Sequence, residues 1–560
     1  MKKLLICLLA LVLASSLMAP MASAAGYTDI PAGSSLAGEV QKAVDYGLMN
    51  GYTDTIFGYS NSMTRAQFTA VLVRMMGWET ETPVTATYTD VPAESTWYTA
   101  IETAAAHDVT GSGTAFRPND SVTRGEMAEL LVRALGLETA AAALNSSSFP
   151  FSDAYEILHG SLPFTDLPQG NEGFISVAYA IGMTKGATAT TFAPNATATR
   201  AQAAAMLVRI YEKLHQETDF VHGFYAISSH SQLNLAEEMD AVSAGWSRMT
   251  WDGETALLVT TSANGNEYAI PSGYQEVTSA LEENRVPLHL SVFMSGDSLK
   301  VMLASESGRR QAVEQIVNEV TVDYKTIGKS PYSGVTIDFE GLRGAQKADF
   351  ISFLSELDRE LEALEKSLYV CVSPVLSSGY YDGAWYDGYD YGAIGSLADK
   401  VILMAYDYDT QDMSQFLGGT YHQTAATAPI DQVYLGLKNL AEAVPDTSKI
   451  VLGFSAKATA WQIDETGKLV SSTPVYPATN TVAKRLAQPD TEYHWSSTYQ
   501  QPYAIYTTED GGRYFLWYQD EESVQIALNA AKLLGVTGVS IWRLGLIPQY
   551  ANYDWSGLLV

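Results

Sequence analysis

An internal repeat in the first third of the chain constrains its fold more than any other feature of the sequence. Three segments open with an aromatic residue followed by Thr-Asp: Tyr27-Thr28-Asp29, Tyr88-Thr89-Asp90 and Phe164-Thr165-Asp166. Each closes with a Thr-Arg pair that starts a helical pattern, at Arg65, Arg124 and Arg200, and a second arginine follows nine residues later in all three. One such unit cannot bury its apolar face alone, so the pattern predicts helical repeats packed against one another.

The threonine of each Thr-Arg pair precedes an amphipathic run, where its hydroxyl accepts hydrogen bonds from free backbone N–H groups. A Gln or Glu three residues later completes a capping box, at Gln67, Glu126 and Gln202. The arginine lies in the first helical turn, where the helix dipole disfavours a cation. An anionic partner outside the domain would explain that position. An ion pair with an Asp of the same domain is the alternative.

These segments resemble the S-layer homology domain over residues 25–214. The matching motifs are Thr-Arg-Ala-Gln in repeats one and three, Thr-Arg-Gly-Glu in repeat two, Phe116-Arg117-Pro118-Asn119 and Phe192-Ala193-Pro194-Asn195. The resemblance implies a three-repeat α-helical module that binds an acidic secondary cell-wall polysaccharide. Its binding arginines would be Arg65, Arg124 and Arg200. We expect the repeats at residues 25–80, 85–138 and 162–215, with an insertion or linker at 139–161.

The N-terminus has the pattern of an export signal. Two lysines precede an apolar run from Leu4 to Leu13, and small residues lie before a cleavage point after Ala24. This run is too short to cross the roughly 30 Å of a bilayer's hydrocarbon core. Residues 1–24 are therefore predicted to be a signal peptide, and the mature protein to be secreted, attached non-covalently to the cell wall and free of the membrane. The net charge of −30 disfavours binding to nucleic acid.

From residue 216 to residue 560 the pattern changes to short apolar strands that alternate with helical segments. Eight such runs predict an α/β domain with a parallel (β/α)8, or TIM, barrel. The predicted strands are Val221–Ala226, Ala241–Met249, Leu288–Phe293, Gly334–Glu340, Leu368–Pro374, Lys400–Tyr408, Lys449–Ser455 and Gly538–Trp542.

The strand from Gly334 to Glu340 carries the chemistry. Side chains alternate along a strand, so Thr336, Asp338 and Glu340 share one face and the apolar residues between them share the other. Glu340 ends the strand, and the active sites of such barrels lie at the carboxyl ends of the strands. A second acid nearby raises the pKa of one member of the pair, which keeps Glu340 protonated as a general acid requires. The alternative is an Asp-x-Glu sequence on the protein surface.

This stretch resembles the signature of family 18 glycoside hydrolases, Asp-Gly-x-Asp-x-Asp-x-Glu, with Ser333 and Thr336 in place of two of its acids. Further landmarks follow in the family's order: Gly223-Phe224-Tyr225, Met404-Ala405-Tyr406-Asp407 and Gly538 to Gly545. The resemblance covers residues 219–560 and is closest to the spore and cell-wall lytic branch. It implies retaining hydrolysis in which the substrate's own acetamido group assists. Glu340 would protonate the glycosidic oxygen and Asp338 would orient the acetamido N–H, with no metal or cofactor.

The same resemblance assigns the binding residues. Tyr406 would hydrogen-bond the acetamido carbonyl, Asp407 would bind the sugar near the cleavage point, and Trp542 would form the floor under the ring. Tyr225 is a further candidate beside Asp338, and Thr336 would donate a hydrogen bond to Asp338. For Tyr406 and Trp542, core packing is an equal alternative.

The sequence leaves several functions open. The preferred one is hydrolysis of a β-1,4-linked glycan containing N-acetylglucosamine, with peptidoglycan first and chitin second. The alternatives are a weak or inactive glycan-binding barrel, which Ser333 and Thr336 suggest, and a structural protein of the surface layer. The aromatic segment Tyr380–Tyr389 would line a glycan groove or pack under the barrel rim, and His222, His289 and His422 show no metal-ligand spacing.

Overall fold

A computed structural model describes residues 26–145, 162–226, 229–323, 328–374, 387–408, 412–421 and 426–548. The predicted signal peptide, most of the insertion at 139–161, His422, and Tyr380 to Tyr386 lie outside these residues. The chain divides into two compact units. The first holds Met1–Ala134, Phe164–Leu167 and Gly182–Glu212, and the second holds Leu135–Pro163, Pro168–Ile181 and Lys213–Val560. The predicted domain boundaries remain a prediction.

The helices of the repeats begin where the capping pattern predicts. Helix α3 (Arg65–Met76), α5 (Arg124–Ala134) and α9 (Arg200–Leu214) each start at the arginine of a Thr-Arg pair. At α3 the hydroxyl of Thr64 accepts from the backbone of Gln67, whose side chain accepts in return from the backbone of Thr64. The same reciprocal bonds occur at the other two helices, so the capping boxes are confirmed. Two shorter helices, α2 (Ala37–Asp45) and α4 (Tyr98–Ala106), belong to the same unit, whereas α6 (Glu138–Ala143) and α8 (Glu172–Ala180) fall in the second unit.

The three repeats close into a ring. The backbone N–H of Arg65 donates to the second repeat at Asp120, and that of Arg124 donates to the third repeat at Ala196. Arg200 then donates back to the first repeat at Asn61, and all three bonds measure 2.9 Å. Isolated β-bridges join the same three pairs of repeats. Stacked repeats usually form an open row whose ends need caps, whereas here the third repeat covers the first.

The recurring Thr-Asp of the repeats fixes the loop before each long helix. Asp29 accepts hydrogen bonds of 2.7 to 2.8 Å from the backbone N–H groups of residues 57–59. Asp90 and Asp166 accept equivalent bonds from the corresponding loops. Burial raises the pKa of each carboxyl, but these backbone donors outweigh it and hold the pKa below its ordinary value. The aspartates therefore hold the backbone of this loop in place in each repeat.

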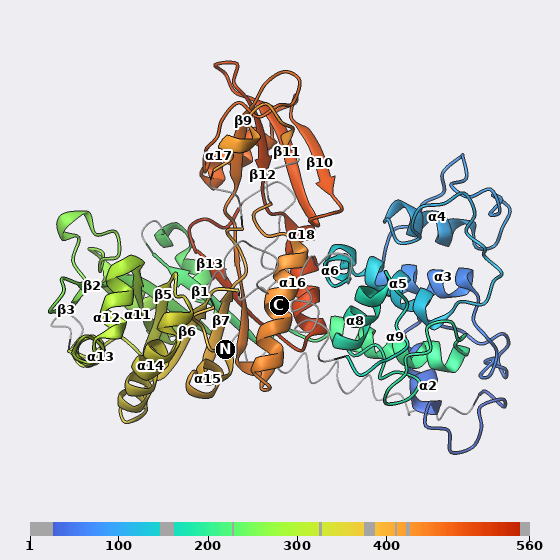
Figure 1. The fold of residues 1–560 in the computed structure, drawn as a ribbon, viewed down its shortest axis with the longest axis horizontal. Helices are drawn as coiled ribbons and strands as arrows, with labels where there is room; N and C mark the ends of the chain where they lie inside the picture. Colours follow the sequence, from blue (N-terminus) through green and yellow to red (C-terminus); the bar gives the residue numbers. More distant parts are fainter. Residues whose placement is uncertain are drawn as a thin grey trace. The chain divides into compact units, whose positions relative to one another are not determined.

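The second unit contains a closed parallel barrel, as predicted, and Figure 1 labels most of its strands. Neighbouring strands pair in the order β1-β13-β8-β7-β6-β5-β4-β2, and β2 also pairs with β1, which closes the circle. Within the described residues, each predicted strand is present, and β7 ends four residues earlier than expected. The strands are β1 (Phe220–Tyr225), β2 (Ala241–Trp251), β4 (Leu288–Ser295), β5 (Gly334–Glu340), β6 (Ser367–Val372), β7 (Lys400–Met404), β8 (Ile450–Ser455) and β13 (Gly538–Trp542).

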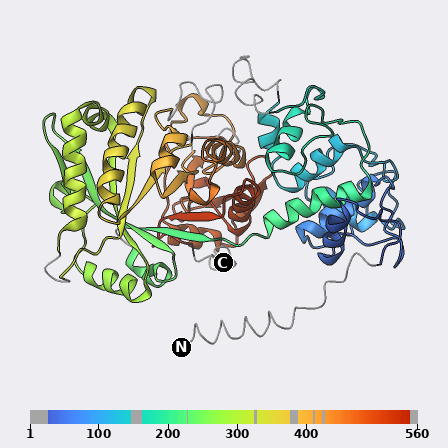
Figure 2. The same ribbon diagram turned by 90° about the horizontal axis from the view of Figure 1, so that it is seen from below.

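Helices cover the outside of the barrel, as Figure 2 shows for the green and yellow segments. They are α10 (Leu233–Ala236), α11 (Tyr274–Asn284), α12 (Gly296–Ala304), α13 (Glu306–Thr321), α14 (Lys347–Glu362), α15 (Tyr391–Leu397), α16 (Ile430–Ala443) and α18 (Glu521–Leu533). Helix α14 sets the orientation of β5. Its buried Phe350 and Phe353 pack on Phe339, with ring centroids 6.2 and 5.1 Å apart. Because Phe339 points outward, Asp338 and Glu340 on either side of it point inward.

An antiparallel sheet inserted between β8 and α18 was not predicted. Its strands are β9 (Thr459–Ile463), β10 (Glu492–Ser496), β11 (Gln501–Thr507) and β12 (Arg513–Trp517), in the order β10-β11-β12-β9, with α17 (Thr479–Leu486) beside them (Figure 1). One face buries Trp461, Phe515 and Trp517, and the other buries Leu516 and Val482 of α17. A short strand β3 (Ala256–Val259), antiparallel to β2, was also missed.

Candidate active site

The acid pair lies on the inner face of β5. Thr336, Asp338 and Glu340 are in register with Ser291, Phe293 and Ser295 of β4, so these six residues form three levels up the barrel. Asp338 is 5% exposed and Glu340, one level higher at the end of the strand, is partly buried. The two acids therefore share one face, at the carboxyl end of a barrel strand, where this fold builds its active sites.

Both carboxyl groups are held toward their protonated forms. Burial and the neighbouring Glu340 raise the pKa of Asp338 well above its ordinary value. Burial and Asp407 raise the pKa of Glu340. Two buried acids that lie two positions apart on one face of a strand titrate as a pair and retain a proton to higher pH than isolated acids do. In addition, Oδ1 of Asp338 is buried and has no hydrogen-bond partner within the described residues. The pair thus offers one proton to donate and one unused acceptor.

A buried network of neutral side chains crosses the barrel below the pair. His222 bonds Ser540 and Ser243 at 2.7 Å each, and Ser243 bonds Thr336 at 2.6 Å. Thr336 also approaches His289 at 3.4 Å, and His289 bonds Ser367 at 2.9 Å. His289 lies on β4 and Ser367 on β6, so both strands contribute to the network. Burial lowers the pKa of both histidines to about 3, so they are uncharged near neutral pH.

The position of Thr336 changes its expected role. Its side chain is fully buried and bonds to the network below it, and no hydrogen bond joins it to Asp338 as the sequence suggested. The reason is that polar groups of the neighbouring strands lie at the same level of the barrel, closer than a residue two positions along its own strand. Thr336 can therefore reach a substrate only indirectly.

Tyr406 and Asp407 follow the end of β7 and lie close to the acids. Burial raises the pKa of the Tyr406 phenol, and the charge of Asp338 raises it further. Asp407 has a left-handed backbone, with φ of 63°, and pairs with Nζ of Lys457 at 3.1 Å. Lys457 lies just after β8 and was missed from the sequence. A rule that flags polar residues directly after each barrel strand would have found it.

The two aromatic candidates differ in exposure. Trp542 ends β13, is partly buried and meets the ring of Phe224 edge-on at 5.1 Å. It packs against the apolar cluster inside the barrel, so it contributes to the core. Tyr225 is 3% exposed and packs edge-on against Trp246 at 6.2 Å. Burial raises the pKa of its phenol to about 12. Trp542 thus retains a face that a ligand can contact, whereas Tyr225 has little.

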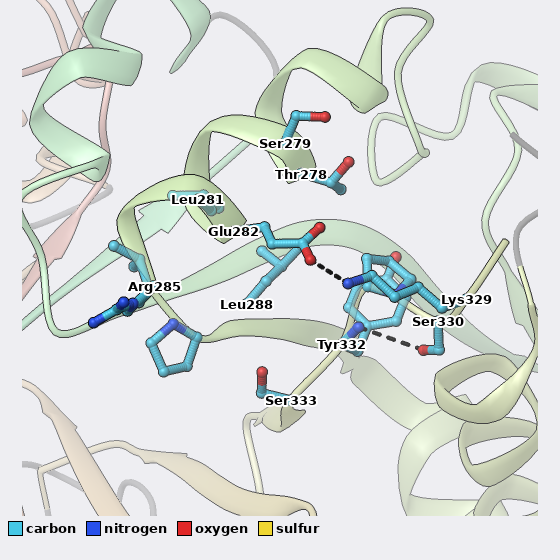
Figure 3. A pocket seen from close by; sticks show the side chains of 13 residues that line it. Thr278, Ser279, Leu281, Glu282, Arg285, Leu288, Lys329, Ser330, Tyr332 and Ser333 are labelled. Carbon is cyan, nitrogen blue, oxygen red and sulfur yellow. Dashed lines mark hydrogen bonds and ion pairs between the residues drawn. The ribbon is translucent and has the colours of Figure 1, made fainter. Parts of the chain in front are cut away.

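A cavity of about 320 Å³ lies at the opposite end of the strands (Figure 3). It is lined by α11 and by the residues that lead into β4 and β5, and Lys329 bonds Glu282 across it. Ser333 also lines it. Seven residues of strand, about 23 Å, separate Ser333 from Glu340. The replacement of an acid by Ser333 is therefore remote from the acid pair, and this cavity is not the site defined by Asp338 and Glu340.

The arginines of the repeats are buried and join one repeat to the next. Nε of Arg65, Arg124 and Arg200 donates to a phenylalanine carbonyl of the following repeat, at 3.0, 2.8 and 3.0 Å. Each guanidinium also lies about 5 Å from the ring of that phenylalanine. Arg65 pairs with Glu126 of the second repeat at 2.9 Å, and Arg124 bonds Thr184 at 3.1 Å. These partners are not the same-domain aspartates considered from the sequence.

A closed parallel barrel with an inward-facing acid pair at the carboxyl end of a strand is an arrangement that glycoside hydrolases use. The sequence profile of glycosyl hydrolases family 18 matches residues 193–546, and that of the S-layer homology domain matches residues 26–69, 87–128 and 163–204. The chain belongs to glycosyl hydrolases family 18 and carries three S-layer homology domains.

Several characterised proteins are similar to parts of the chain. The cortical fragment-lytic enzyme of Bacillus subtilis (strain 168) is 28% identical over 254 residues, which are 45% of this chain and 54% of that protein. The amylopullulanase of Thermoanaerobacterium thermosulfurigenes is 32% identical over 167 residues, 30% of this chain and 8% of that protein. The chain thus spans about half the length of the first of these relatives. The structure of the spore cortex-lytic enzyme SleL of Bacillus megaterium QM B1551 aligns at 21% identity and a TM-score of 0.47, covering 59% of this chain and 72% of that one.

Two classes of feature are not found in the described part of the chain. It contains no helix long and apolar enough to cross a bilayer, and it contains no group of three His, Cys, Asp or Glu side chains arranged to hold a metal ion.

Proposed function

We propose that the barrel hydrolyses a β-1,4-linked glycan containing N-acetylglucosamine, with Glu340 as general acid and Asp338 as its partner. The observation that carries this proposal is the buried acid pair, in which both pKa values are raised and which presents an unused acceptor, Oδ1 of Asp338. An unsatisfied buried acceptor costs about 1–3 kcal/mol. The N–H of an acetamido group would remove that cost.

The reaction proceeds in two steps. Glu340 gives its proton to the glycosidic oxygen, and that bond breaks as the substrate's acetamido oxygen attacks the anomeric carbon. The resulting cyclic oxazolinium is positively charged, and ionised Asp338 stabilises it while accepting its N–H. A water molecule then attacks the anomeric carbon and gives a proton to ionised Glu340. The acetamido group is re-formed, and the configuration is retained.

Neighbouring side chains position the sugar. Tyr406 donates its hydroxyl to the acetamido carbonyl, Asp407 accepts from sugar hydroxyls, and Trp542 stacks under the ring. Thr336 and Tyr225, both buried, act by fixing the base of the site. The neutral histidines below contribute no charge, so the pKa values of the acids depend on burial, on each other and on Asp407.

The substrate we favour is peptidoglycan, with chitin second. The similarity to an enzyme named for cortical fragment lysis supports this order, together with the S-layer homology domains on the same chain. We infer that the repeats bind an acidic secondary cell-wall polysaccharide through Arg65, Arg124 and Arg200. A guanidinium carries five N–H donors, more than the contacts between repeats use. Export through residues 1–24 and attachment to the wall complete this proposal.

One assay distinguishes a hydrolase from a barrel that binds glycan without cleaving it. The second of these is the alternative that Thr336 favours. Muropeptide release from purified bacterial walls is measured for the wild type and for Glu340→Gln, with a soluble chitooligosaccharide in parallel. We expect the substitution to reduce kcat by at least about 100-fold while the walls still bind the protein. Activity that survives the substitution would defeat the mechanism. A wild type as inactive as the variant, with binding intact, would favour the binding protein.

A further inference from the structure

A cation, an aromatic ring and an acid lie side by side across three strands at the carboxyl end of the barrel. Arg248 of β2 is in register with Phe293 of β4, which is in register with Asp338 of β5. Neighbouring strands are about 4.8 Å apart, so the Cα atoms of Arg248 and Asp338 are separated by about 10 Å. A register shift in β2 between Ala244 and Ser247 brings Arg248 to this level. The arginine therefore adjoins the acid pair without touching it.

Two stacked rings hold the guanidinium of Arg248. The rings of Tyr268 and Phe293 are nearly parallel, with centroids 4.7 Å apart and 4° between their planes. The guanidinium carbon lies 4.8 and 5.1 Å from their centroids. Such contacts orient a cation but do not neutralise it. The side chain of Arg248 also hydrogen-bonds the Tyr268 phenol, whereas its buried Nε has no hydrogen-bond partner within the described residues.

The charges nearby show that this cluster belongs to the mouth of the site. Burial raises the pKa of the Tyr268 phenol, the charges of Asp338 and Glu340 raise it further, and Arg248 opposes them. A second guanidinium, that of Arg543, also lies within electrostatic range of Tyr268. The pKa values of both acids nevertheless remain raised, so Arg248 does not neutralise them. A fixed cation in a chain of net charge −30 is suited to an anion supplied by the ligand.

We propose that Arg248, held by Tyr268 and Phe293, is a specificity residue that binds the carboxylate of a carboxylated sugar in the glycan. This inference rests on the proposed function and narrows its substrate class. A planar guanidinium matches a carboxylate with two parallel hydrogen bonds. An uncharged polymer of N-acetylglucosamine offers no such group, whereas a glycan in which N-acetylglucosamine alternates with a lactyl-ether sugar offers one at each lactyl group that carries no peptide. The subsite therefore selects the carboxylated glycan.

The test compares three substrates that differ in charge. They are glycan strands freed of peptide that retain their lactyl carboxylates, the same strands with those carboxylates amidated, and a chitooligosaccharide. The variants are Arg248→Gln, Arg248→Lys and the control Arg310→Gln, which removes the same charge from an exposed position on α13. We expect Arg248→Gln to lower kcat/KM on the carboxylated strands roughly ten- to a hundredfold, the value of a charged hydrogen bond. On the two neutral substrates we expect kcat/KM to change by less than about threefold.

The remaining outcomes also decide the proposal. Arg248→Lys retains part of the preference for carboxylated strands because it retains the charge, and Arg310→Gln leaves all three rates unchanged. Equal losses on the carboxylated and amidated strands would make Arg248 a structural residue, and no loss on either would also overturn the inference. If the wild type cleaves none of the substrates, binding of the same three glycans is measured instead. Carboxylate-dependent binding that Arg248→Gln abolishes would then support the subsite while the proposed hydrolysis fails, and binding without that preference would refute it.

Discussion

The arginines that join the repeats allow a quantitative prediction for Arg124→Ala. The substitution removes the 2.8 Å bond to the Phe192 carbonyl, the 3.1 Å bond to Thr184 and the contact with the Phe192 ring. A hydrogen bond from a charged group contributes about 1.5–3 kcal/mol, and a cation–π contact adds about 0.5–2 kcal/mol. Burial of the guanidinium, which lowers its pKa, offsets part of this gain. We therefore expect the free energy of unfolding of the repeat module to fall by about 3 kcal/mol.

The measurement is differential scanning calorimetry of the whole chain. For a module of this size, each 1 kcal/mol shifts Tm by about 2–4 °C, so the transition of the repeats should fall by roughly 10 °C. The transition of the barrel is the internal reference. Arg117→Ala is the matched control, because Arg117 is 54% exposed and its pair with Glu126 contributes little. A shift for Arg124→Ala no larger than that of the control would refute a structural role for the buried arginines.

Three further predictions concern the barrel. Phe353→Ala should lower its stability by about 3–5 kcal/mol, measured by calorimetry, because this fully buried ring supports the outer face of β5; an unchanged transition would contradict that packing. The charge of Asp407 raises the pKa of Glu340, so Asp407→Asn should lower that pKa and move the basic limb of the kcat/KM profile to lower pH; a shift to higher pH would exclude Glu340 as the acid titrated there. Removal of the Thr336 hydroxyl in Thr336→Val should destabilise the barrel by about 1–3 kcal/mol, since Ser243 loses one of its two hydrogen-bond partners, and an equal stability of the two proteins in urea would contradict the network.

Local patterns allowed much of this structure to be predicted. The bounds of β5 follow from strict alternation between apolar residues under helices and polar residues inside the barrel, which β5 shows from Gly334 to Glu340. The starts of α3, α5 and α9 follow from the chemistry of their caps. In both cases the deciding interactions lie within a few residues along the chain, where a sequence can be interpreted directly.

The inserted sheet and the Arg248 cluster depend on distant contacts instead. Apolar residues of β11 and β12 are buried on both faces of the inserted sheet, so these strands lack the polar alternation that marks a strand with one face in solvent. The 82 residues between the end of β8 and the start of β13 were the one available signal that an extra layer was present. Arg248 reaches the level of Phe293 only through the register shift in β2. Neither the shift nor the resulting level can be deduced from sequence spacing.

The closed ring of three repeats limits which changes in repeat number a gene for such a module can tolerate. In an open row, loss of an end unit exposes one new surface, and its neighbour can adapt with a few substitutions. In the ring, loss of any unit exposes two surfaces at once, and it leaves one loop without its arginine donor and one arginine without its carbonyl acceptor. A gene that gains or loses a single unit would thus encode a protein with unmatched edges, and recombination should preserve these units in complete sets of three.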